Sequence, residues 1–310
     1  MYELHQDAAS LPVYLYGVMI ALGCALCWMT LTFTARREGL KDGTAVLTML
    51  IALPLGLILS RLMFCLLDVN YRSIAKPADW LRLTDGGFGM FGALGGAMIA
   101  AIFAAGIMVQ KKISLLAALM PGLFLFIFFE RLGEGFVSGL GLSRSLIYDT
   151  FKNTFLAQSG EYDMYLRTWI LEACFALVLF VVSLMILAHS EKPSHAFMKC
   201  LMLFGATQVL CESLRYDYHM TYSFVGVQHV LSMVALGVPV LIMGFRLLKR
   251  HKALSLMGII SIPVVTALCV FLEFRIDRHS DNRFMIYGIY TLLLCIPTVL
   301  GFMLIRRDRA

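Results

Sequence analysis

The chain has 310 residues, of which 60% are apolar and only 15% are charged, with a net charge of +6. Soluble domains are about half apolar and about a quarter charged, so this composition excludes an ordinary soluble protein. The basic residues form no stripe with interleaved aromatic residues. We therefore expect no nucleic-acid partner and relate the positive charge to membrane topology and anionic lipid.

Nine apolar segments follow one another along the chain, each long enough to cross about 30 Å of hydrocarbon as a helix. The predicted spans are residues 13–34, 46–67, 87–109, 115–132, 168–189, 198–214, 227–248, 255–274 and 284–305. The first segment lacks a basic leader and a small-residue cleavage site, so we interpret it as a retained span. The predicted fold is an all-α integral membrane bundle.

Two parts are expected along the chain. Residues 1–250 form a membrane core, and residues 251–310 form an appended transmembrane hairpin that is peripheral to the chemistry. The connection over residues 135–167 is too long for a simple loop and should form a small head or lid.

Alternate loops carry most of the basic residues, and short loops rich in Lys and Arg stay in the cytoplasm. These loops and the tail contain Arg36, Arg37, Lys41, Lys111, Lys112, Lys192, Lys199, Arg246, Lys249, Arg250, Lys252, Arg306, Arg307 and Arg309. An odd number of spans then places the N-terminus outside and the C-terminus in the cytoplasm. The head over residues 135–167 faces outward.

The eight cysteines lie inside or at the edges of apolar spans, where a disulfide framework is not expected. The seven histidines are scattered, without the spacing of metal ligands. We expect neither a protein-bound metal nor a cofactor.

Six glycines lie between Gly86 and Gly96. Two interpretations stay open for this glycine run. A ligand can sit against the bare backbone, or the small residues let two helices approach closely.

Ionisable residues inside the predicted spans are costly to bury in lipid and usually face a polar cavity. They lie toward the outward ends of the spans: Arg61, Glu130, Arg131, Glu134, Glu172, Glu212, Arg215 and Asp217. We expect them to share one cavity, in which the three arginines bind the phosphate of a phospholipid headgroup. The alternative is a structural network of local pairs, with Glu130 near Glu134 and Glu212 near Arg215.

Seven short segments, in colinear order over residues 12–245, resemble the bacterial prolipoprotein diacylglyceryl transferases. They are Tyr16-Gly17, Ser60-Arg-Leu-Met-Phe64, the glycine run, Glu130-Arg-Leu-Gly-Glu134, Thr168-Trp-Ile-Leu-Glu-Ala173, Glu212-Ser-Leu-Arg215 and residues 228–232. The resemblance implies a seven-span core in the bacterial inner membrane, with a small periplasmic head and a side opening to the bilayer.

Such enzymes move the diacylglyceryl group of phosphatidylglycerol onto the thiol of a lipobox cysteine in a secreted preprotein. The products are a thioether and glycerol phosphate. The resemblance implies that the partners are a phospholipid and a lipobox peptide, and we expect a monomer.

The resemblance also implies roles for single residues. Arg61, Arg131 and Arg215 hold the phosphate, Glu212 orients an arginine, and Tyr16 or Glu134 lies near the thiol. The remaining predicted substrate contacts are Gly86, Gly87, Gly92, Gln208 and Glu130.

Four positions depart from the family pattern. Phe91 stands where the family has His, and Gln208 stands where it has Arg. Glu130 and Glu134 replace the Gly and Asn of the family signature, so the formal charge shifts toward negative. A phosphate anion should bind less well, and Glu130 or Glu134 is then expected to replace the missing base.

Two further functions stay open. One is a catalytically altered relative that binds or handles lipid, and the other is a small-solute transporter that uses the same cavity.

Overall fold

The computed structural model describes residues 11–82, 86–137, 140–146, 153–159, 163–216, 220–222, 225–278 and 283–308. Within these ranges, nine helices are long and apolar enough to cross a membrane. They are α1 (Leu11–Arg37), α2 (Thr44–Leu67), α4 (Met90–Ile107), α5 (Lys112–Glu134), α7 (Thr168–His189), α8 (Pro193–Leu214), α9 (Val227–Leu247), α10 (Lys252–Arg278) and α11 (Arg283–Arg307). The predicted all-α membrane fold is confirmed, and each predicted span coincides with one of these helices.

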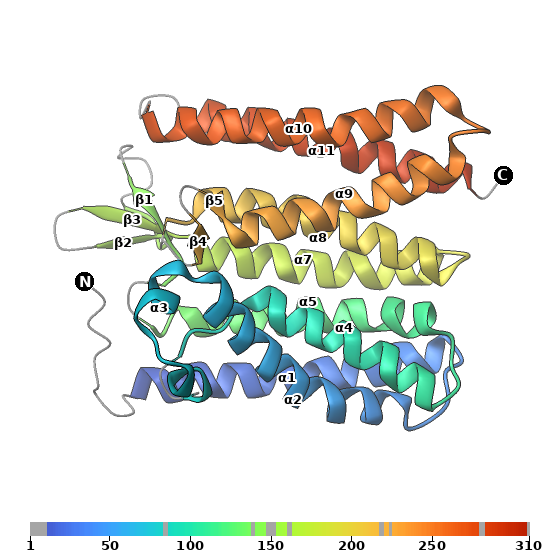
Figure 1. Ribbon diagram of the computed structural model, residues 1–310, viewed down its shortest axis with the longest axis horizontal. Helices are drawn as coiled ribbons and strands as arrows, with labels where there is room; N and C mark the ends of the chain where they lie inside the picture. Colours follow the sequence, from blue (N-terminus) through green and yellow to red (C-terminus); the bar gives the residue numbers. More distant parts are fainter. Residues whose placement is uncertain are drawn as a thin grey trace.

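The long helices lie side by side in one bundle (Figure 1). Helix α5 is the most buried, with 61% of its span enclosed, and it packs against α1, α4, α7 and α8. The outer helices turn apolar side chains outward, among them Leu50 and Phe103, which are 65% and 60% exposed. Such an exposed apolar surface is what a bundle surrounded by lipid requires.

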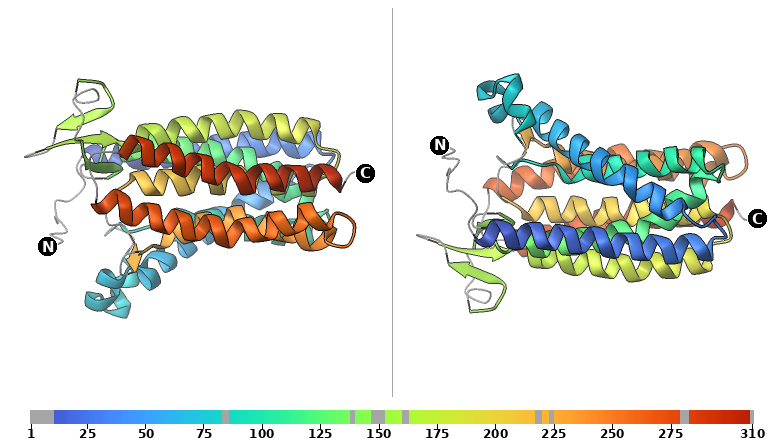
Figure 2. Two further views of the ribbon diagram at one scale, coloured as in Figure 1. Left: turned by 90° about the horizontal axis from the view of Figure 1, so that it is seen from above. Right: turned by 90° about the horizontal axis from the view of Figure 1, so that it is seen from below.

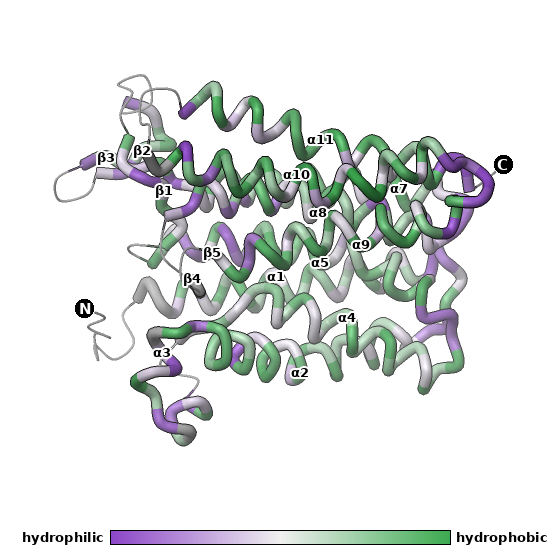
Figure 3. Tube along the Cα trace, turned by 45° about the horizontal axis from the view of Figure 1, so that its top comes forward, coloured by the Kyte–Doolittle hydropathy of each residue, from purple (hydrophilic) through white to green (hydrophobic). Residues whose placement is uncertain are grey.

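The two ends of the bundle differ. The loops after α1, α4, α7 and α9 lie at the same end as the C-terminus, which we call the basic end (Figure 1). Hydrophilic segments gather at both ends and the hydrophobic stretches lie between them (Figure 3). The basic loops therefore lie at the end of the bundle opposite the long connection, as predicted.

A small sheet forms the head at the other end, which we call the head end. Strands β1 (Leu142–Ser145), β3 (Met164–Arg167) and β2 (Ala157–Ser159) pair antiparallel in that order. Strand β3 runs directly into α7. Helix α3 (Val69–Ile74), helix η1 (Pro77–Leu81) and the short strands β4 (Thr221–Tyr222) and β5 (Val225–Gly226) complete the described elements.

The glycine run brings α2 and α4 together. A Cβ at Gly92 would lie 2.5 Å from the carbonyl oxygen of Leu59, and a Cβ at Gly96 would lie 2.7 Å from the Cα of Gly56. Only glycine fits such a close backbone approach. The geometry at Gly92 and Gly96 thus fits close helix packing, and the predicted substrate contact of Gly92 stays a prediction.

The hairpin of α10 and α11 packs on α8 and α9, and polar bonds tie it to them. Tyr290 is fully buried, and its hydroxyl oxygen lies 2.7 Å from Nε2 of His229 on α9. The Tyr287 hydroxyl donates to the carbonyl oxygen of Ser213 at 3.1 Å, close to the end of α8. The hairpin thus contacts the segment that leads into Arg215.

Candidate functional site

Charged side chains from three helices meet near the head end. Arg131 and Glu134 lie in the last turns of α5, Glu172 lies in the second turn of α7, and Arg215 directly follows α8. The residues Glu130, Arg131, Glu134, Glu172 and Arg215 are called the Arg–Glu network below. Arg131 is 2% exposed and Glu172 is 3% exposed, so the network is inside the protein.

Two carboxylates bridge the two guanidinium groups. Arg131 Nη1 lies 2.5 Å from Glu134 Oε1, and Arg131 Nε lies 2.8 Å from Glu172 Oε2. Arg215 Nη1 lies 3.2 Å from Glu134 Oε2 and 3.3 Å from Glu172 Oε1. Each carboxylate therefore contacts both arginines, and the network joins α5, α7 and α8.

The local structure explains why these side chains meet. Arg131 and Glu134 are three residues apart on a helix, which places them on one face. Arg215 has an extended backbone, and it forms a bridge with Ser143 of β1. The head thus fixes the chain where it leaves α8. Within the network, Arg215 pairs with Glu134 on α5 and Glu172 on α7.

Glu130 and Tyr16 extend the network toward α1. Glu130 Oε2 lies 3.3 Å from Arg131 Nε. The Tyr16 hydroxyl donates to Glu130 Oε1 at 3.5 Å, a long bond. A Cβ at Gly133 would lie 2.7 Å from the Tyr16 ring, so this glycine makes room for the tyrosine. The structure therefore brings the predicted residues Tyr16, Glu130 and Glu134 to one place.

Gln208 and Glu212 lie beside the network on α8. Gln208 Nε2 donates to Glu212 Oε1 at 3.1 Å. A neutral amide thus contacts Glu212 at the position where the family resemblance expects an arginine. The predicted role of Glu212 in orienting an arginine stays a prediction.

Arg61 has a different environment from the other two arginines. Its guanidinium group has five N–H donors. The five hydrogen bonds go to the carbonyl oxygens of Asp79, Trp80, Gly86 and Gly87 and to the hydroxyl of Tyr71. Every donor is used within the protein, and the predicted phosphate contact of Arg61 stays a prediction. In this structure Arg61 clamps the segment between α2 and α4.

Gly86 and Gly87 belong to this Arg61 clamp. Their φ angles are +70° and +73°, a left-handed backbone that glycine adopts without a Cβ penalty. The two carbonyl oxygens accept bonds from Arg61 Nη1. Gly86 and Gly87 thus make a structural contact with Arg61, and their predicted contacts with substrate stay predictions.

Phe91 packs into the core. Its ring centroid lies 5.7 Å from that of Phe204, which in turn packs on Phe124 at 5.9 Å. A phenyl ring transfers no proton. The position at which the family resemblance expects His is therefore part of an aromatic cluster.

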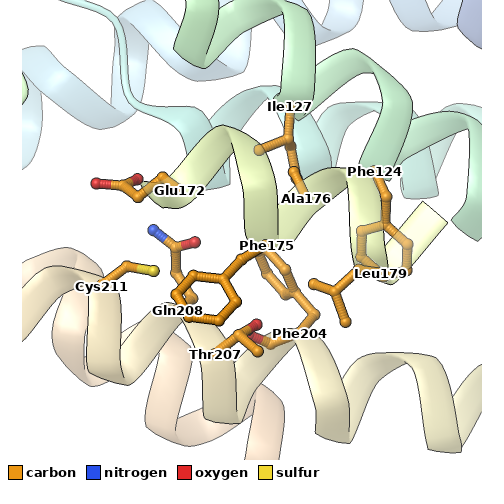
Figure 4. A pocket seen from close by; sticks show the side chains of 10 residues that line it. All are labelled: Phe124, Ile127, Glu172, Phe175, Ala176, Leu179, Phe204, Thr207, Gln208 and Cys211. Atoms are coloured by element: carbon orange, nitrogen blue, oxygen red, sulfur yellow. The ribbon is translucent and has the colours of Figure 1, made fainter. Parts of the chain in front are cut away.

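The hollow next to the network is small. Its volume is about 10 Å³, close to one water molecule. Figure 4 shows Glu172, Gln208 and Cys211 at one end of it and Phe124 and Leu179 at the other. This hollow is too small for a lipid headgroup, and the shared polar cavity expected from the sequence stays a prediction. The charged side chains fill the site by pairing with one another.

Glu172 is expected from the sequence to share the cavity, but no specific role is predicted for it. In the structure it contacts both arginines and borders the hollow. Met90 was also missed, and its sulfur accepts from Arg131 Nη2 at 3.1 Å. The spacing of residues along the chain predicts neither contact.

Asp217, which the sequence also placed in the cavity, lies outside the described residues.

The network can bind an anion and accept a proton. Guanidinium groups suit phosphate oxygens, and buried carboxylates can serve as bases. Its two arginines and three glutamates leave one formal negative charge in excess. Within the described residues, no group of three or more His, Cys, Asp or Glu side chains is arranged to hold a metal ion.

The family model and the relatives that this chain matches are named for the same enzyme. The family model "Prolipoprotein diacylglyceryl transferase" matches residues 6–247. A Bacillus velezensis protein named phosphatidylglycerol–prolipoprotein diacylglyceryl transferase is 25% identical over 257 residues, covering 78% of this chain and 90% of the relative. A Lactobacillus acidophilus protein of the same name is 24% identical over 247 residues, covering 76% of this chain and 87% of the relative. The family match ends within α9, so α10 and α11 lie beyond it.

Proposed function

The chain belongs to the prolipoprotein diacylglyceryl transferase family, and we propose that it transfers a diacylglyceryl group from phosphatidylglycerol to a cysteine thiol of a secreted preprotein. The relatives named above carry this activity in their names. The observation that supports the proposal is the buried Arg–Glu network, which lies in the matched region and offers both cations and bases.

The proposed reaction is a displacement at carbon. The lipobox cysteine gives its thiol proton to a carboxylate, for which Glu134 is our candidate. The sulfur then attacks the carbon of the diacylglycerol unit that is bonded to the phosphate oxygen. The S–C bond forms while the C–O bond breaks, and the electron pair leaves on the phosphate oxygen. Glycerol phosphate departs with one more negative charge than the ester had.

The network couples the proton to the phosphate. In the resting state Glu134 contacts both Arg131 and Arg215. When Glu134 accepts the thiol proton it becomes neutral, and its hold on both guanidinium groups weakens. The arginines are then available to the departing phosphate when its charge increases. Stabilisation that grows with developing charge is the kind that accelerates a reaction.

The proposed orientation follows from the basic residues. The basic end carries most of the Lys and Arg loops, and such loops remain in the cytoplasm. The head and the Arg–Glu network then face the outer side of a bacterial inner membrane, where secreted preproteins emerge. We further propose that the monomer is the working unit.

The test is a reaction with purified components. The full chain is incubated in detergent with phosphatidylglycerol and a lipobox peptide, and glycerol phosphate release and peptide mass are measured. We expect equal amounts of glycerol phosphate and diacylglyceryl peptide. A peptide with Ser in place of the lipobox Cys is the matched control and should give neither product.

A second function is favoured by one specific feature, the packing of Phe91 against Phe204. A relative that binds lipid without transferring it has no need of a proton-carrying side chain there. Binding of phosphatidylglycerol without glycerol phosphate release, under conditions where an active family member turns over, would support this alternative and contradict the transferase proposal.

A further inference from the structure

A cleft opens between α8 and α11 at the basic end of the bundle. Its volume is about 540 Å³, which is within the usual range of ligand pockets. The lining residues are Lys199, Leu203, Thr298, Val299, Phe302, Met303 and Arg306. Figure 2 shows α8 and α11 running the length of the bundle, with the C-terminus at the basic end. One wall belongs to α11, which lies beyond the family match.

The sequence places the lining residues on two continuous helix faces. Lys199 and Leu203 are one turn apart on α8. On α11, Val299, Phe302 and Arg306 recur at intervals of three and four, as one helical face requires. The cleft therefore combines an apolar wall with cations near its polar end. Lys199 Nζ lies 5.8 Å from the centroid of the Phe302 ring.

Ion pairs of Asp308 lie beside the cleft, two residues after Arg306. Asp308 Oδ2 lies 2.9 Å from His195 Nε2 and 3.6 Å from Lys192 Nζ, and Asp308 Oδ1 lies 3.1 Å from Arg246 Nε. These contacts tie the end of α11 to the start of α8 and to the end of α9. They hold the walls of the cleft together.

We propose that this cleft binds one anionic phospholipid, with its phosphate between Lys199 and Arg306 and an acyl chain along Leu203, Phe302 and Met303. Basic pockets between transmembrane helices suit anionic headgroups, and the apolar wall suits the acyl chain. The site is separate from the Arg–Glu network. Helix α8 has 22 residues, about 33 Å in length, and it carries the cleft near its start and Arg215 at its end.

The experiment maps lipid contacts directly. The full chain in zwitterionic bilayers receives a trace of phosphatidylglycerol with a photoactivatable acyl chain, and the labelled peptides are identified by mass spectrometry. We expect label in residues 198–206 and 298–306. Excess unlabelled phosphatidylglycerol should remove the label, whereas excess phosphatidylcholine should not.

Matched variants test the role of charge. Lys199→Gln with Arg306→Gln removes two cations from the cleft, and we expect labelling of both segments to fall about tenfold. Lys249→Gln with Arg250→Gln removes two exposed cations from the loop after α9 at the same end, and labelling should stay nearly unchanged.

Two results would overturn the proposal. Equal competition by phosphatidylcholine would mean that the cleft holds ordinary surrounding lipid. An equal loss of labelling in the two double variants would mean that the basic end attracts anionic lipid without a specific site. Labelling at residues 130–134 or 212–215 reports the proposed substrate site separately, so the two proposals fail independently.

Discussion

Arg215 at the end of α8 reaches Glu134 on α5, with 3.2 Å between Nη1 and Oε2. The two residues are far apart in the chain, and their contact closes the bundle across its core at the head end. Arg131 uses the other oxygen of the same carboxylate. The carboxylate of Glu134 thus contacts two arginines and is also the proposed base. It is therefore the first residue to test.

We expect Glu134→Gln to lose transfer activity by about 10²-fold or more, because general-base catalysis typically contributes 10²–10⁴-fold. The amide keeps the shape of the side chain but does not accept the thiol proton. The measurement is the rate of glycerol phosphate release. Glu130→Gln is the matched control and should lose less. Full activity in Glu134→Gln would refute the assigned role.

The variant Glu172→Gln tests whether the Arg–Glu network stabilises the fold. Glu172→Gln leaves Arg131 and Arg215 with fewer carboxylates, and breaking a buried ion pair costs about 3–5 kcal/mol. We expect a clearly lower thermal unfolding midpoint in detergent. Glu191→Gln, at an exposed position after α7, is the control and should change the midpoint little. Equal midpoints for the two variants would contradict a structural role for Glu172.

The positions of the spans could be predicted from the sequence because apolar length is a local property. The pairing of Arg131 with Glu134 follows from helical spacing in the same way. The link from Arg215 to Glu172 could not be predicted, because it depends on how α7 and α8 pack. The five bonds of Arg61 depend on how residues 71–82 and 86–87 fold around it. The charge of Arg61 inside a span indicates that the residue is important. Only the tertiary structure decides whether its guanidinium group binds a ligand or the backbone.

Arg61→Lys distinguishes a clamp from a phosphate ligand. Lysine keeps the positive charge but has three donors instead of five, and it lacks the planar fork. We expect faster amide hydrogen exchange in residues 71–89 and a smaller effect on the KM for phosphatidylglycerol than Arg215→Lys produces. If exchange in this segment is unchanged and the KM rises as much as in Arg215→Lys, then Arg61 acts as a phosphate ligand.

Adjacent glycines on α4 provide a test of helix packing. A Cβ at Gly96 meets the Cα of Gly56 at 2.7 Å, whereas a Cβ at Gly95 meets nothing within 4 Å. We expect Gly96→Ala to destabilise the protein by about 1–3 kcal/mol through overpacking. Gly95→Ala should be neutral or stabilising by up to about 1 kcal/mol, because alanine favours helix more than glycine does. Thermal unfolding of both variants is the measurement, and the reverse order would contradict the packing.

The contact between Asp308 and His195 predicts a pH dependence of stability. Partial burial acts to raise the pKa of Asp308, but the hydrogen bond with His195 and the charges of Arg246 and Lys192 outweigh it and lower this pKa below 3.8. A carboxyl group with a lowered pKa in the folded state stabilises the fold above its ordinary pKa. That stability is lost as the pH falls through the folded value.

We therefore expect wild type to unfold at a higher temperature than Asp308→Asn at about pH 6, where the carboxylate is charged in both folded and unfolded states. The difference should begin to shrink as the pH falls below about 4, where the unfolded chain takes up the proton, and should vanish only below the lowered folded-state pKa, where Asp308 is neutral in both states. The measurement is the unfolding midpoint of both proteins over this range. Asp42→Asn, which alters an exposed carboxylate at the same end, should follow wild type throughout. A difference between wild type and Asp308→Asn that persists unchanged at low pH would show that the aspartate stabilises the C-terminal end through packing and not through its charge.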